Sequence, residues 1–178
     1  MLDGHRSEYL LRLAGPLRLV RRDGTDLTPN AAKARGMLAL IGTSANQRRP
    51  RSWLQDKLWS DRQPEQGAQS MRQALSMMRR ELGPDGACLI VEKGWVGLDP
   101  NRVAVALEAE PADLGFGGEI PEFCEGLDIV DPEFEDWIRD QRAAFAEAAE
   151  AMLECHQAGS GAGAARTGPQ VVRTVDLP

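Results

Sequence analysis

Cysteine, long hydrophobic runs and targeting features are all scarce in this chain. Its 178 residues hold three cysteines, widely spaced and without a Cys-x-x-Cys pair, which fits neither a disulfide framework nor a zinc clip. The apolar run Met37–Ile41 is far shorter than the roughly 20 residues of a membrane span. The opening residues MLDGHRSE contain no hydrophobic targeting segment. We therefore expect a cytoplasmic protein with no membrane partner.

The motifs of common enzyme sites are missing as well. The two histidines, His5 and His156, lie near opposite ends of the chain, and no serine occupies a Gly-x-Ser-x-Gly turn. The glycine-rich segment 159–163 lacks the Gly-Lys-Ser/Thr of a phosphate-binding loop, and the acidic stretch 119–136 lacks calcium-loop spacing. Cys155 beside His156 has no second pair of ligands nearby. The sequence predicts a non-enzymatic protein without metal, cofactor or small-molecule substrate.

Positive charge is almost absent from the second half of the chain. Residues 1–100 carry 16 Lys and Arg against 11 Asp and Glu, a net charge of +5, whereas residues 101–178 carry 5 against 16, a net charge of -11. Electrostatic binding depends on the field within about 8–10 Å, so a basic half can bind a polyanion although the whole chain has a net charge of -6. Apart from this charge division, the amino-acid composition is ordinary for one globular domain, with 42% hydrophobic residues.

The first hundred residues predict an α+β domain. Residues 9–28 alternate apolar and polar side chains around an Asp23-Gly24 turn, which predicts two or three short antiparallel strands. Thr28-Pro29 resembles a helix cap followed by proline in the first turn, and predicts a first helix over about 30–45. The segment NQRRPRS then reads as an arginine-rich turn, and a short second helix starts at Pro50 and ends near Trp59.

A longer third helix is predicted over Pro64–Leu82, because Gly83-Pro84 cannot continue it. Its apolar residues recur at helical spacing and form one stripe: Met71, Leu75, Met78 and Leu82. Residues 88–99 read as two strands around Lys93-Gly94. The order of strands, helix, turn, helix, longer helix and hairpin is that of a winged helix-turn-helix, in which the last helix enters the major groove.

The face of the third helix opposite the apolar stripe carries the candidate base-reading residues. At 100° per residue, four of them fall within about 40° of the pole opposite Met71, and two arginines flank them. Glutamine can pair with adenine, arginine with guanine, and serine with either base. The predicted base-reading set is Gln69, Arg72, Gln73, Ser76, Arg79 and Arg80.

Two neighbouring segments supply candidate phosphate contacts. Arginines precede the second helix, and a lysine and a tryptophan lie at the tip of the predicted hairpin, or wing. The set is Arg48, Arg49, Arg51, Lys93 and Trp95. Such contacts position a protein on DNA without reading its sequence.

Beyond residue 100 the chain becomes acidic and helical. The segment VAVALEAE predicts one more strand, and Asp131-Pro132-Glu133 is a typical helix start. The helix that follows repeats apolar residues that must pack on a partner or on the chain itself: Phe134, Trp137, Ile138 and Phe145. We predict a protein interface there, with self-packing and homodimerisation both open. Residues 158–178 predict a flexible tail or linker.

At KARGMLALI, WLQDKLWSD, PEQGAQSMRQALSMMRRELG and GWVGLDP, the chain resembles the OmpR/PhoB-type winged-helix DNA-binding domain, and most of all the Streptomyces antibiotic regulatory protein (SARP) family of transcriptional activators. The resemblance covers about residues 8–107. It implies side-by-side protomers on direct DNA repeats and recruitment of RNA polymerase, and by position it matches five of the base-reading residues, all except Arg80. Residues 108–157 resemble the start of the helical bacterial transcriptional activation domain, which suggests a piece of a longer regulator or a short form.

The sequence also departs from that family. Met77 stands where the family has a basic or polar residue, Gly67-Ala68-Gln69 replace Ala-Arg-Asn, and Trp53 occupies a normally polar position. We expect Trp53 to pack locally. The domains predicted are 1–107, a winged helix that binds double-stranded DNA, 108–157, an acidic helical extension, and the tail. An adaptor that docks on RNA polymerase or on another regulator without reading DNA is the alternative.

Overall fold

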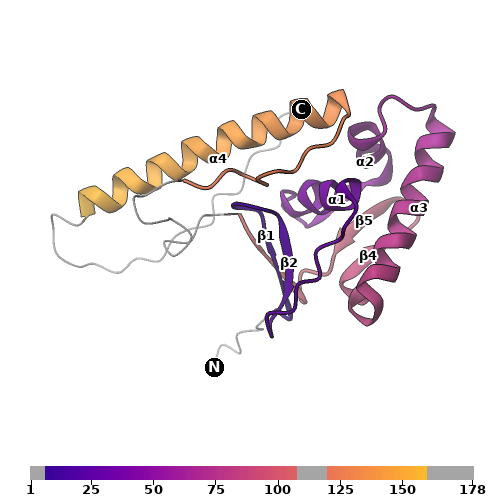
Figure 1. The fold of residues 1–178 in the computed structure, drawn as a ribbon, viewed down its shortest axis with the longest axis horizontal. Coiled ribbons are helices and arrows are strands. Elements are labelled where there is room, and N and C mark those ends of the chain that lie inside the picture. Colours follow the sequence, from indigo (N-terminus) through magenta and orange to yellow (C-terminus); the bar gives the residue numbers. More distant parts are fainter. Residues whose placement is uncertain (1–6, 108–119, 160–178) are drawn as a thin grey trace.

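A three-stranded sheet lies at the N-terminal side of the protein, which a computed structural model describes over residues 7–107 and 120–159. Its strands are β1 (Tyr9–Arg12), β2 (Arg18–Arg21) and β6 (Val103–Ala106), in the order β2-β1-β6. β1 and β2 are antiparallel, as the sequence predicts, and β6 is parallel to β1. The predicted strand after residue 102 is therefore present, and it makes the sheet mixed (Figure 1).

Three helices follow the first two strands. They are α1 (Ala32–Gly42), α2 (Arg51–Leu58) and α3 (Pro64–Leu82). The predicted limits of α3 are confirmed, but the cap predicted for α1 is wrong. Thr28 accepts a hydrogen bond from the Leu19 amide at 3.0 Å, so its hydroxyl serves the sheet, and α1 begins three residues beyond Pro29 without a side-chain cap.

The wing forms a second sheet. A short 3₁₀ helix, η1 (Gly83–Cys88), leads from α3 into β4 (Leu89–Val91) and β5 (Trp95–Leu98). β5 also pairs with β3 (Arg48–Pro50), giving the antiparallel order β3-β5-β4. The predicted arginine-rich turn is thus partly a strand. With α2, α3 and this hairpin, the first hundred residues have the winged helix-turn-helix arrangement (Figure 1).

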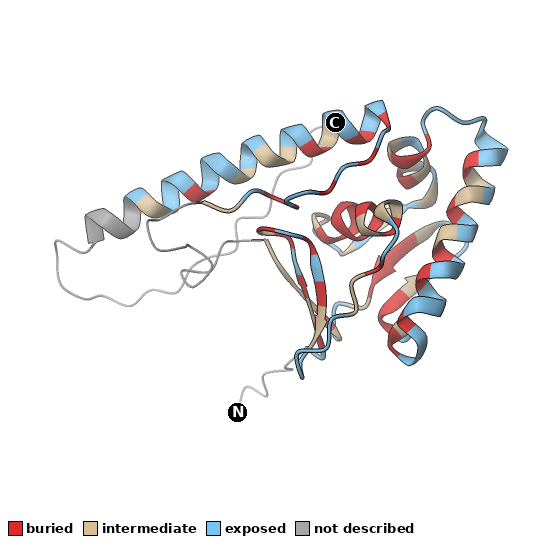
Figure 2. Cartoon of the chain, viewed as in Figure 1, coloured by how far each residue is buried: buried red, intermediate tan, exposed pale blue. Residues whose placement is uncertain are grey.

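A long helix, α4 (Pro132–Gly159), follows the segment 120–131, which returns to the N-terminal sheet. Phe123 forms a β-bridge with Ala14. Arg142 on α4 donates to the carbonyl oxygens of Phe123 at 3.2 Å and Cys124 at 3.2 Å. The acidic region therefore shares one hydrophobic core with the winged helix, across the predicted boundary at residue 107 (Figure 2).

The predicted protein interface on α4 is partly wrong for this reason. Phe134 and Ile138 are buried in the chain's own core, so the self-packing alternative describes them. Trp137 is partly buried and meets Phe134 and Phe123 with ring centroids 5.4 and 6.2 Å apart, and Phe145 contacts Phe123 at 6.0 Å. These four aromatic rings form an internal cluster. The tail predicted over 158–178 begins within α4, which reaches Gly159, and residues 108–119 and 160–178 lie outside the described residues.

A buried carboxylate joins α4 to the helix-turn-helix. Asp131 is 0% exposed and caps α4 by accepting from the Glu133 amide at 3.1 Å. The same carboxylate accepts from the amide of Ser60, at 2.9 Å, and from its hydroxyl, at 2.6 Å. Since Ser60 follows α2, one side chain fixes the start of α4 against the end of α2.

We expect Asp131→Ala to lower the free energy of unfolding by about 1–3 kcal/mol, because three partly buried hydrogen bonds from the Ser60 amide, the Ser60 hydroxyl and the Glu133 amide lose their acceptor. Urea denaturation measures this change. Asp128→Ala, an exposed residue of the same segment, is the control and should change stability by no more than about 0.5 kcal/mol. Equal effects of the two substitutions would contradict the role given to Asp131.

A second polar link joins the N-terminal sheet to the end of α3. Asp85 in η1 accepts from the Tyr9 hydroxyl at 2.8 Å and from Arg21 Nε at 3.2 Å. The hydrogen bonds from Arg21 and then Tyr9 lower the pKa of Asp85 below its ordinary value. Burial, followed by the hydrogen bond to Asp85, raises the pKa of Tyr9 to about 12, so Tyr9 remains a donor at neutral pH.

The lowered pKa of Asp85 predicts that this link weakens in acid. Above the ordinary carboxyl pKa, Asp85 is ionised in both the folded and the unfolded chain, and its full stabilisation of the fold is present. As the pH falls, the unfolded chain takes up the proton first, so the stabilisation is lost as the pH approaches the lowered folded pKa. The difference in unfolding free energy between the unsubstituted protein and Asp85→Asn should shrink below about pH 4, measured by urea denaturation at several pH values. If this difference in unfolding free energy does not change with pH, Asp85 does not provide a pH-dependent link.

Candidate nucleic-acid interface

The outward face of α3 carries every residue predicted to read bases. The apolar stripe of the helix is buried, and the six candidates on the other side are all exposed: Gln69, Arg72, Gln73, Ser76, Arg79 and Arg80. Figure 2 shows the outer side of α3 as exposed along its length. The structure thus brings the six together on one accessible surface.

This face is not neutralised by carboxylates of the chain. Within the described parts of the chain, none of the six side chains takes part in a hydrogen bond or an ion pair. The two acids of α3 lie in its first and last turns, as Glu65 and Glu81, and Glu81 accepts a hydrogen bond from the Asn30 amide at 3.2 Å. The three arginines therefore keep their donors for an external acceptor.

A close crossing with α2 fixes the start of α3. A Cβ atom on Gly67 would lie 2.8–3.0 Å from side-chain atoms of Gln55, so glycine allows the contact. Gln55 Nε2 in turn donates to the Pro64 carbonyl oxygen at 2.7 Å, and Arg62 donates to Ser70 Oγ at 2.7 Å. Gly67 thus leaves room for the Gln55 side chain against the start of α3.

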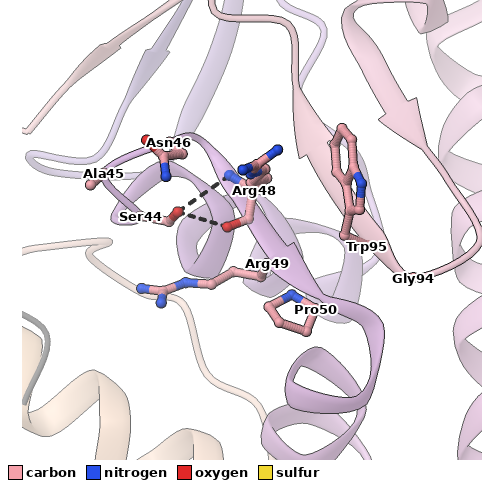
Figure 3. A pocket seen from close by; sticks show the side chains of 8 residues that line it. All are labelled: Ser44, Ala45, Asn46, Arg48, Arg49, Pro50, Gly94 and Trp95. Carbon is pink, nitrogen blue, oxygen red and sulfur yellow. Dashed lines mark hydrogen bonds between the residues drawn. The ribbon is translucent and has the colours of Figure 1, made fainter. Parts of the chain in front are cut away.

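The wing presents two of the predicted phosphate contacts at the surface. Lys93 lies exposed in the turn between β4 and β5, and exposed Arg48 lies over the Trp95 ring, 5.5 Å from its centroid. A shallow pocket of about 390 Å³ lies beside them, lined by Ser44, Ala45, Asn46, Arg48, Arg49, Pro50, Gly94 and Trp95 (Figure 3). β5 can lie against β3 because Gly97 has no side chain, since a Cβ atom there would be 2.6 Å from the Gln47 carbonyl oxygen.

Arg51 ties the wing to α2. Its backbone amide donates to the Gly94 carbonyl oxygen at 3.0 Å, and its Nη1 donates to the Glu92 carbonyl oxygen at 3.3 Å. Both acceptors belong to the turn of the wing. These two hydrogen bonds hold the wing tip against the start of α2, and part of the Arg51 guanidinium is already engaged.

Arg49 differs from the prediction that it grips phosphate. It extends away from Trp95 (Figure 3) and is partly buried. Its Nε donates to the Leu40 carbonyl oxygen at 3.1 Å, near the end of α1, and its guanidinium lies over the Trp53 ring at 4.5 Å. Arg49 therefore has a packing role, and the local packing predicted for Trp53 is confirmed.

The acidic residues of α4 lie away from this face. Glu133 pairs with Lys57 on α2 at 2.7 Å, and beyond its first turn α4 runs away from α3 (Figure 1). Its six remaining acids are all exposed: Glu135, Asp136, Asp140, Glu147, Glu150 and Glu154. The charge division of the sequence thus becomes a spatial separation.

Two exposed residues of the same face were not among the predicted sites. Gln66 lies within about 40° of the pole opposite Met71 by the same helical arithmetic and is exposed. Met77 is 52% exposed and lies about 60° from the same pole. The 100° projection finds both, once the whole face is considered rather than its centre.

The described residues show no other built site of a familiar kind. No group of three or more His, Cys, Asp or Glu side chains that could hold a metal gathers in this part of the protein. None of its helices is both long and apolar enough to cross a bilayer. The side chains of Cys155 and His156 are outside the described set.

Comparison with known proteins adds little to this geometry. No family model matches the chain, and no curated protein matches it. Among solved structures, EmbR of Mycobacterium tuberculosis in complex with a low-affinity phosphopeptide is similar at 24% identity and a TM-score of 0.45, over 55% of this chain and 27% of the EmbR chain. The chain thus spans about a quarter of the EmbR chain. A likeness of this extent establishes neither family nor function.

The different packing of Arg48 and Arg49 predicts different effects of their substitution on stability. Arg49→Ala should lower the free energy of unfolding by about 1–2 kcal/mol, because it removes a partly buried hydrogen bond and a cation–π contact. Arg48→Ala, whose side chain is exposed, should change it by no more than about 0.5 kcal/mol. Urea denaturation of both variants provides the comparison. If Arg48→Ala proves the more destabilising, the packing role of Arg49 is wrong.

Proposed function

We propose that this chain is a transcription regulator that reads the sequence of double-stranded DNA. In this model α3 lies in the major groove, and the wing lies along the phosphate backbone. The observation that supports it most is the outward face of α3, where six side chains suited to base edges are exposed and free of carboxylate partners among the described residues.

The dimensions of the helix suit this task. An α-helix with its side chains is about 10–12 Å wide, and the major groove is about 12 Å wide. The Gly67 crossing and the buried stripe of α3 hold the helix so that only its polar face can enter the groove. Gln69 and Gln73 then offer pairing to adenine, and the arginines offer pairing to guanine.

The wing and the start of α2 complete the proposed surface by holding phosphates. The exposed side chains of Arg48 and Lys93 can reach the DNA backbone, and the Trp95 ring packs against the Arg48 guanidinium. Two hydrogen bonds from Arg51 hold the wing tip, which carries Lys93, against the start of α2. Phosphate contacts of this kind would set the register in which α3 meets the bases.

The resemblance of the sequence to the SARP family supports finer proposals. We propose that two protomers bind side by side on direct repeats, that the complex acts in the cytoplasm as an activator, and that it recruits RNA polymerase. Residues 1–107 form the DNA-binding unit. The exposed acidic side of α4 offers a protein-contacting surface that lies away from the DNA.

Titration with DNA tests the central proposal. The chain should bind random duplex DNA at micromolar concentration in moderate salt, with an affinity that falls steeply as salt rises. Selection from a random duplex pool should then yield a common sequence. Failure to bind any duplex would overturn the proposal in favour of the adaptor that docks on another protein.

Two substitutions separate base reading from phosphate binding. Gln73→Ala should relax preference at one or two base pairs, with a loss of roughly 1–3 kcal/mol of discrimination. Lys93→Ala should weaken selected and random duplexes alike and reduce the slope of log affinity against log salt by about 0.9. Fluorescence anisotropy over a salt series measures both. If Gln73→Ala instead weakens binding to selected and random duplexes equally, α3 does not read bases as proposed.

A further inference from the structure

Met77 is an apolar side chain on the polar face of α3, about 60° from the pole opposite Met71. It is 52% exposed, and the described residues contain only two other large hydrophobic side chains that are exposed, Val130 and Met152. Gln73 precedes Met77 by one helical turn, and Arg80 follows it by nearly one turn, both on the same side of the helix. The side chain therefore stands within the proposed DNA-reading surface.

Packing within the chain does not account for this position. The apolar stripe of α3 passes through the next residue, Met78, which is 1% exposed, and Met77 belongs neither to the hydrophobic core nor to the residues packed against it. Its exposed surface gains free energy only when a ligand covers it. The only apolar group that a base pair shows in the major groove is the C5-methyl group of thymine.

We propose that Met77 reads a thymine by contact with this methyl group. This inference rests on the proposed function, because it requires α3 to lie in the major groove. The unbranched, polarisable methionine side chain adapts its shape to the surface that it meets. A basic or polar residue at this position would instead bind a phosphate or a base edge, so Met77 changes which base the helix prefers.

The position of Met77 also restricts where the thymine lies. Four residues of an α-helix span about 6 Å along its axis, and successive base pairs are about 3.4 Å apart. The thymine should therefore lie within about two base pairs of the base pair that Gln73 contacts. Together, the glutamine and the methionine favour two A·T pairs that lie close to each other in the bound site.

Deoxyuridine provides the direct test, since it differs from thymidine only by the missing methyl group. The full chain is titrated with its selected duplex, and each thymine is replaced in turn by deoxyuridine. At one position the affinity should fall about fourfold, the value for one buried methyl-sized group. Elsewhere on the duplex it should stay the same within error.

Substitution of Met77 connects this methyl group to the side chain. Met77→Ala should bind the thymidine and deoxyuridine duplexes equally at that position, whereas Met77→Leu should keep most of the difference. Met152→Ala is the matched control, because Met152 is also exposed, at 44%, but lies on α4. This control should retain the full fourfold difference. Circular dichroism checks that each variant is folded.

Two results would overturn the inference while leaving the proposed function intact. One is binding that is insensitive to deoxyuridine at every position of the selected duplex. The other is a methyl preference that survives in Met77→Ala. A chain that binds no duplex at all would instead overturn the proposed function, and with it the role of Met77.

Discussion

The burial of one apolar stripe determines what the rest of this protein can do. Met71, Leu75, Met78 and Leu82 turn one side of α3 toward the core, so the polar side must face outward. A shift of this stripe by a single residue would rotate the helix by about 100°, enough to carry Arg72 and Arg79 toward the interior. Burial of four hydrophobic side chains is worth several kcal/mol, roughly 1.5–3 kcal/mol each, far more than surface interactions could oppose.

The acidic region is packed into the same fold as the winged helix and is not a separate appendage. Phe123, Phe134 and Ile138 lie in the same core as the winged helix, and Asp131 joins α4 to the end of α2. Because α4 then runs away from α3 (Figure 1), its carboxylates cannot screen the arginines of the outward face. A chain with a net charge of -6 thereby keeps, on α3, three exposed arginines without acidic partners among the described residues.

Local features of the sequence predict most of the elements. Pro64 and Gly83 mark the two ends of α3, the spacing of its apolar residues gives its orientation, and Asp131-Pro132 marks the start of α4. Parallel pairing of β6 and the strand β3 were not predicted, because each depends on a partner far away in the sequence. The periodicity of α4 predicts an apolar face but not what packs on it. The residues next to Arg49 in the sequence do not determine the direction of its guanidinium.

The pairing of β1 with β6 has a consequence for how the protein is made. Tyr9 lies beside Val103, so the first strand emerges from the ribosome long before its parallel neighbour exists. The β1–β2 hairpin and the helices can form from contacts nearer in the chain, whereas closure of this sheet must wait for nearly the whole winged-helix unit to be synthesised. Nascent chains that stop before this point leave one edge of β1 unpaired, and such edges promote aggregation.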